Sequence, residues 1–189
     1  MTTTRRTFIR GTGLGVLSFT VGGSAMLLTP RDARAKGADL KVLSDSEAEL
    51  LEAFGEALAP GASEAGIAHF VDSQLAADPR AALLMIKSFN VPPPYAGFYR
   101  GGLAALDTYA KKAHGAGFRE LEATDVEAVM DAFVASLGGA QPDGWDGPPA
   151  VLFYLALRSD AVDVVYGTVE GFERLGVPYM PHIVPPKPW

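Results

Sequence analysis

The sequence predicts an all-α protein, a single bundle of five to seven helices followed by an extended proline-rich C-terminal tail. Apolar residues recur at helical spacing along most of the 189 residues. Two Ser/Thr-x-x-Glu sequences, at 44–47 and 124–127, are typical of helix starts. Between residues 36 and 177 we find no alternation of period two and no hairpin dipeptide between β-branched runs, which argues against a sheet.

Six helices are expected, at about residues 44–59, 63–78, 79–89, 95–114, 124–137 and 149–158, the last with an extension to residue 165 left open. Pro60-Gly61 stops the first, and Gly138-Gly139 ends the fifth. Pro79 suits the first turn of the third helix. Three consecutive prolines at 92–94 cannot be helical and are expected to form an extended spacer.

Residues 1–35 have the composition of an export leader. They carry five arginines and one aspartate, a net of +4, whereas the other 154 residues hold 11 basic and 21 acidic side chains, a net of −10. Arg5 and Arg6, followed by Phe8, resemble a twin-arginine signal. The uncharged run 11–29 is only moderately apolar, and its glycines favour export over anchoring in a membrane. Ala33-Arg34-Ala35 has the small-x-small pattern that a signal peptidase accepts. The alternative is a retained N-terminal helix with an accidental arginine pair.

The chain is therefore divided into a leader at 1–35, a helical domain at 36–177 and a tail at 178–189. Five of the twelve tail residues are proline, and aromatic residues lie between them. Such a segment forms neither helix nor central strand. It either folds back over its own bundle or lies along a partner protein, and the sequence leaves both open.

Candidate catalytic chemistry is weak. The chain has no cysteine, which excludes disulfides, zinc–cysteine sites, iron–sulfur clusters and covalent haem attachment, and a net charge of −6 argues against nucleic-acid binding. The acidic pairs Glu49 with Glu52 and Glu52 with Glu56 are expected to form a solvated face. His69 is expected at the surface, and His114 is expected to complement the helix dipole. No Glu-x-x-His sequence occurs, so no catalytic, cofactor-binding or metal-binding residue is predicted.

Several stretches, spaced in order over about residues 43–180, together resemble the gluconate 2-dehydrogenase subunit 3 family. They are Leu43–Ala48, Glu64–Asp72, Tyr99–Asp107, Phe118–Leu121, Tyr166-Gly167, Gly171-Phe172 and Leu175–Pro178. The resemblance implies a small accessory subunit of a periplasmic sugar or polyol dehydrogenase. Its large subunit would be a flavin-dependent enzyme of the glucose–methanol–choline type that holds FAD, and a multihaem cytochrome c would be a possible third subunit.

The resemblance also implies that this chain carries the export signal and that the folded flavoprotein is exported with it to the periplasm through the twin-arginine translocase. The export signal is assigned to Arg5, Arg6, Phe8, Ala33 and Ala35. The family supplies no catalytic residues. A structural or partner-docking role is assigned to Tyr166, Gly167, Phe172, Gly176, Pro178, Tyr179 and Trp189. Two alternatives remain open at this point, a free-standing periplasmic enzyme and a small-ligand-binding helical domain.

Overall fold

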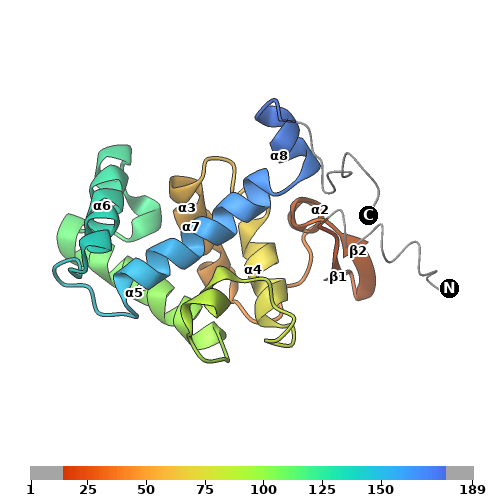
Figure 1. Ribbon diagram of the computed structural model, residues 1–189, viewed down its shortest axis with the longest axis horizontal. Helices are drawn as coiled ribbons and strands as arrows, with labels where there is room; N and C mark the ends of the chain where they lie inside the picture. The colour runs from red at the N-terminus through yellow and green to blue at the C-terminus, as the bar shows by residue number, and fades with distance from the viewer. Residues whose placement is uncertain (1–14, 178–189) are drawn as a thin grey trace, which may run out of the picture.

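Residues 15–177 are described by the computed structural model, and most of them are helical (Figure 1). The α-helices are α2 (Pro30–Ala35), α3 (Asp45–Leu58), α4 (Ile67–Leu75), α5 (Ala96–His114), α6 (Ala123–Ala135), α7 (Ala150–Tyr166) and α8 (Val169–Arg174). Short 3-10 helices are η1 (Met85–Phe89), η2 (Phe118–Glu120) and η3 (Ser136–Gly138), and the strands are β1 (Leu17–Val21) and β2 (Ser24–Leu28). The predicted helical character is confirmed for most of these residues, whereas the proline-rich tail lies outside the described residues.

The two strands correct the prediction of an all-α chain. They pair antiparallel from Leu17 opposite Leu28 to Val21 opposite Ser24, and Gly22 and Gly23 form the turn at φ +55° and +77°. Two consecutive positive φ angles are required by the tight turns that match the twist of a hairpin, and glycine adopts them without strain. The sequence analysis treated these glycines only as weakening a membrane span, and so it missed the hairpin.

Three helix boundaries also differ from the expected ones. The helix expected from Ser63 begins at Ile67, because Gly66 at its N-cap has a left-handed φ of +83°. The helix expected at 79–89 is reduced to η1, since the Asp78 carboxylate accepts the Arg80 N–H at 2.9 Å and offers the backbone a local alternative to the helix. The helix α6 starts after Glu122 without a side-chain cap, so the capping box predicted at Thr124 is wrong.

The remaining helix predictions hold. Ser44 and Glu47 form the expected capping box of α3, with each side chain bonded to the other residue's backbone N–H. The long helix α5 ends at His114 as expected, and α7 continues to Tyr166, beyond the extension that was left open. None of the helices formed by the described residues combines the length and the apolar character that a membrane crossing needs.

The helix α7 organises the core. Figure 1 shows it running through the middle of the helical part, where it contacts α3, α4, α5 and α6. Phe54 of α3 is fully buried against it, with its ring stacked on Phe153 at a centroid distance of 5.5 Å. The rings of Phe118 and Phe133 lie 5.5 and 5.6 Å from the same Phe54 ring. This aromatic cluster joins four separate segments of the chain.

Asp72 holds the segment that leads into α3. Its buried carboxylate accepts the backbone N–H groups of Lys41, Val42 and Leu43, each at 2.8 Å. Folding partly removes these three backbone donors from water, and the charged carboxylate gives each of them a hydrogen-bond partner. The side chain thus fixes where the chain enters the bundle.

Gly102 allows α5 to pack closely on α7. A Cβ at this position would lie 2.2 Å from the Phe153 ring, whereas a Cβ at the neighbouring Gly101 would meet only Pro148 at 3.9 Å. We expect Gly102→Ala to lower the free energy of unfolding by about 1–2 kcal/mol, because overpacking exceeds the gain in helix propensity. Gly101→Ala is the matched control and is expected to stabilise the protein by about 0.5 kcal/mol. Urea denaturation measures both, and equal stabilities of the two variants would contradict the close packing.

Candidate functional site

The C-terminal corner of the described chain contains most of the residues assigned to docking. The helix α7 ends at Gly167, whose N–H bonds the Asp163 carbonyl at 2.9 Å. Thr168 then caps α8 by accepting the Gly171 N–H at 3.0 Å. A Cβ on Gly171 would lie 2.4 Å from the Val165 carbonyl oxygen, so the two helices meet at a corner that a larger residue would open. These glycines therefore have a structural role.

The end of α8 is closed by a Schellman motif. Gly176 has a φ of +66°, its N–H bonds the Glu173 carbonyl at 2.9 Å, and the Val177 N–H bonds the Phe172 carbonyl at 3.0 Å. Leu175 and Val177 project from this turn with 57% and 47% of their surface exposed. Large apolar side chains that flank a rigid turn are suited to contact another protein.

The other assigned docking residues are placed as follows. Tyr166 and Phe172 are half-buried at the corner, and both belong to the described residues. Pro178, Tyr179 and Trp189 lie outside them. The structure thus brings together Tyr166, Gly167, Phe172 and Gly176, and sequence reasoning missed the exposed Leu175 and Val177 beside them.

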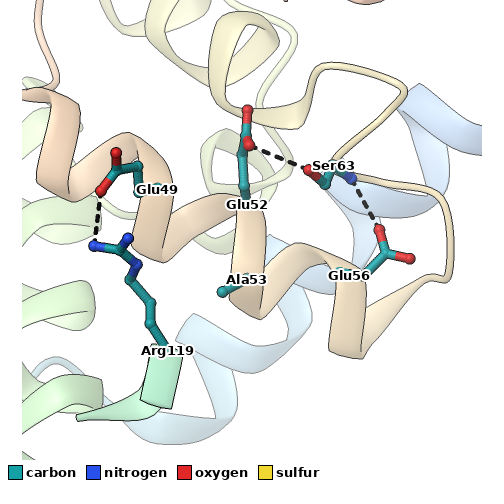
Figure 2. Close-up of a pocket in the computed structure, with 6 residues that line it drawn as sticks. All are labelled: Glu49, Glu52, Ala53, Glu56, Ser63 and Arg119. Atoms are coloured by element: carbon teal, nitrogen blue, oxygen red, sulfur yellow. Dashed lines mark hydrogen bonds and ion pairs between the residues drawn. The ribbon is translucent and has the colours of Figure 1, made fainter.

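The acidic row of α3 lines a surface hollow together with Ala53, Ser63 and Arg119 (Figure 2). Each carboxylate of the row has a partner. Glu49 pairs with Arg119 at 2.7 Å, Glu52 accepts the Ser63 hydroxyl at 3.1 Å, and Glu56 accepts the Ser63 N–H at 3.1 Å. Among residues 15–177, no group of three acidic, histidine or cysteine side chains could hold a metal ion. The row ties α3 to its neighbours.

The two described histidines are also engaged. The Nδ1 atom of His114 pairs with the Asp125 carboxylate at 2.9 Å, which joins the end of α5 to α6. His69 was expected at the surface, but it is half-buried, with its Nε2 atom 3.2 Å from the Ala38 carbonyl and the Phe19 ring against its edge. Its Nδ1 atom has no hydrogen-bond partner. Neither histidine lines the hollow beside the acidic row or the smaller one next to it between α3 and η2.

The predicted export residues fall in two places. Arg5, Arg6 and Phe8 lie outside the described residues. Ala33 and Ala35 belong to α2, and the Ala33 side chain is fully buried.

A buried carboxyl, which the sequence analysis did not single out, joins α7 to two other elements. Asp160 accepts the Tyr99 hydroxyl at 2.5 Å and the Met85 N–H at 3.1 Å. Burial raises the pKa of Asp160 from 3.8 to about 7, while these two hydrogen bonds oppose the rise and the Asp163 carboxylate adds to it. Burial likewise raises the pKa of Tyr99 well above 10.0. This arrangement links α7 to α5 and η1.

Asp160 is expected to make stability depend on pH. Its pKa is higher in the folded chain than in the unfolded one, so the folded state binds the proton more tightly, and stability is lost as the pH rises through about 7. Between pH 5 and pH 8 we expect the free energy of unfolding of the wild type to fall by about 2 kcal/mol more than that of Asp160→Asn. Urea denaturation at each pH measures the difference, and parallel profiles would contradict the assignment.

Comparison with known proteins gives one match. A model of the family described as gluconate 2-dehydrogenase subunit 3 matches residues 45–185. Neither the curated proteins nor the solved structures give a match. The matched region includes the aromatic core, the Asp72 anchor and the C-terminal corner, whereas the hairpin and α2 precede it.

Proposed function

Because the chain belongs to the gluconate 2-dehydrogenase subunit 3 family, we propose that it is a non-catalytic small subunit of a periplasmic sugar or polyol dehydrogenase. In this proposal the catalytic partner is a flavoprotein of the glucose–methanol–choline type, which holds FAD. A multihaem cytochrome c is the possible third subunit. The small chain stabilises the flavoprotein and carries it through the twin-arginine translocase.

The observation that carries the proposal is that the polar side chains which could do chemistry form their bonds within this chain. The acidic row of α3, His114 and Asp72 all bond to this chain's own residues, and the buried Asp160 does the same. A subunit that contributes structure and contact surface needs such internally satisfied groups, whereas an acid–base catalyst needs one aimed at a ligand. Within the described residues, this pattern favours the subunit over the free-standing enzyme.

The twin-arginine sequence supports the export part of the proposal. That route carries folded proteins, and a small domain without cysteine has no evident need to fold before export. A partner that must bind flavin inside the cell does have that need. We therefore infer that the flavoprotein, and not this chain, is the protein that must fold before export.

The contact surface is assigned to the C-terminal corner. Leu175 and Val177 are exposed beside the half-buried Tyr166 and Phe172, and the matched region extends through this corner. Aromatic side chains are enriched at the core of protein interfaces, and exposed apolar residues beside them extend the apolar contact. We therefore expect the corner to contact the flavoprotein.

Co-purification tests the proposal. The full chain is co-expressed with a tagged flavoprotein of the glucose–methanol–choline type from the same genome, and the recovered small chain and bound flavin are measured. We expect a stable complex that keeps its flavin, and we expect Leu175→Asp to reduce recovery at least about tenfold, a loss of roughly 1.4 kcal/mol.

Leu137→Asp is the matched control. Leu137 lies in η3, directly after α6, with 50% of its surface exposed. Figure 1 shows α6 and α8 far apart in the molecule. We expect Leu137→Asp to leave recovery unchanged. Loss with Leu137→Asp but not with Leu175→Asp would place the contact elsewhere, and a flavoprotein that folds and keeps flavin equally well alone would contradict the stabilising role.

A further inference from the structure

The helix α2 is held on α3 and on the turn between α3 and α4 by ion pairs. The Arg34 guanidinium binds Glu52 through two contacts, at 2.9 and 3.2 Å, and also donates to the Ser63 hydroxyl at 3.3 Å. Arg31 pairs with Glu64 at 2.9 Å. The Glu52 side chain is only 21% exposed, which makes its two-pronged pair with Arg34 the stronger of the two.

Close backbone packing also holds α2 against the start of α4. A Cβ on Gly66 would lie 2.2 Å from the Pro30 carbonyl oxygen, so the first turn of α2 lies directly on the backbone at the start of α4. Ala33 is fully buried in a small apolar cluster with Phe19, Leu28 and Ala38. An alanine at position 66, or a larger residue at 33, would separate these surfaces.

The hairpin extends the contact along α4. Phe19 of β1 covers the edge of the His69 ring at a centroid distance of 6.3 Å. The Asp39 N–H bonds the Thr20 carbonyl at 2.8 Å, which ties β1 to the segment that leads into the domain. In Figure 1 the hairpin and α2 lie together at one end of the molecule, beside α4.

The predicted peptidase site lies inside this docked segment. The bond after Ala35 is at the end of α2, and the Lys36 N–H is bonded to the Asp32 carbonyl at 3.0 Å. The Ala38 N–H bonds the Ala33 carbonyl at 2.9 Å, and Gly37 turns the chain at φ +60°. Residues 34–37 are exposed, but Ala33 is fully buried and the backbone on both sides of the bond is held in hydrogen bonds, whereas a protease needs a segment whose backbone is free to enter its active site.

We infer that the face formed by Glu52, Ser63, Glu64, Gly66 and His69 is a docking site for residues 15–35 of the same chain, and that docking protects the bond after Ala35 from signal peptidase. We call this face the leader-docking face. The folded chain keeps its leader until the leader leaves this face. The inference rests on the proposed function only in treating residues 1–35 as an export leader, because the docking itself needs no partner.

Cleavage of the purified full chain tests the inference. Each protein is incubated with bacterial signal peptidase in detergent, and the cut after Ala35 is followed by mass spectrometry. We expect slow cleavage of the wild type and roughly tenfold or faster cleavage of Glu52→Arg/Glu64→Arg, since the rate follows the population of the undocked form. These substitutions leave the sequence around the cut unchanged.

A matched control separates docking from charge. Glu127→Arg/Asp131→Arg changes the same total charge at exposed positions of α6 and is expected to be cut as slowly as the wild type. Adding Arg31→Glu to Glu64→Arg restores an opposite pair outside Ala33-Arg34-Ala35 and is expected to slow cleavage again. Circular dichroism shows whether each variant keeps its helices.

Three results would overturn the inference. One is a wild type cut as fast as Glu52→Arg/Glu64→Arg while both are folded. Another is a synthetic peptide of residues 5–42, which contains the arginine pair, the apolar run and Ala33-Arg34-Ala35, that the peptidase leaves intact, because Ala35 would then precede no cleavage site. The third is fast hydrogen exchange of the Lys36 amide in the wild type. None of these measurements involves a flavoprotein or export, so their outcome is independent of the proposed function.

Discussion

Phe54→Ala is expected to lower the free energy of unfolding by about 4 kcal/mol. The Phe54 side chain is fully buried and contacts three other aromatic rings from separate segments of the chain. Its removal loses the transfer free energy of the ring and leaves a cavity that the surrounding helices cannot fill, because Phe133 and Phe153 also pack on each other.

Urea denaturation followed by circular dichroism measures this loss. Leu83→Ala is the control, because Leu83 is 66% exposed and its truncation should change stability by no more than about 0.5 kcal/mol. A loss below about 1.5 kcal/mol for Phe54→Ala would show that the aromatic cluster is not the centre of the core.

Asp72→Ala is expected to cost about 3 kcal/mol. Its carboxylate accepts three backbone N–H groups from a segment about 30 positions earlier in the chain, and Leu43 in that segment is buried. Without the carboxylate, these donors have no partner or must reach water, so the entry into α3 loosens.

Hydrogen exchange of the amides of residues 41–43 distinguishes this mechanism from a general loss of packing. We expect these amides to lose protection first in Asp72→Ala. The control Asp131→Ala, at an exposed position of α6, is expected to leave both stability and exchange unchanged. Retained protection at 41–43 in Asp72→Ala would contradict the anchoring role.

Local features of the fold could be predicted from the sequence. The capping box at Ser44 and the apolar periodicity of α5 and α7 act within one or two helical turns, so a single segment contains the whole signal. The hairpin at 17–28 also has a local signal in Gly22-Gly23. That signal was missed because the run was interpreted only as an apolar export region.

Other features depend on distant parts of the chain. Asp160 is buried because α7 packs on α5 and η1, and its partners Tyr99 and Met85 are 61 and 75 positions away. Gly66 and Glu52 show their role only once α2 lies on them. At the corner, the glycines were identified from the family resemblance, but the exposure of Leu175 and Val177 depends on how α8 folds back.

The central proposal is that this chain carries a folded flavoprotein into the periplasm, and the export of that flavoprotein tests it most directly. The two proteins are co-expressed, and flavin-bound flavoprotein is measured in the periplasm for the wild type, for Arg5→Lys/Arg6→Lys and for the control Arg10→Lys. We predict export with the wild type and the control, and retention of the folded flavoprotein in the cytoplasm with the double variant. Equal export in all three would contradict the claim.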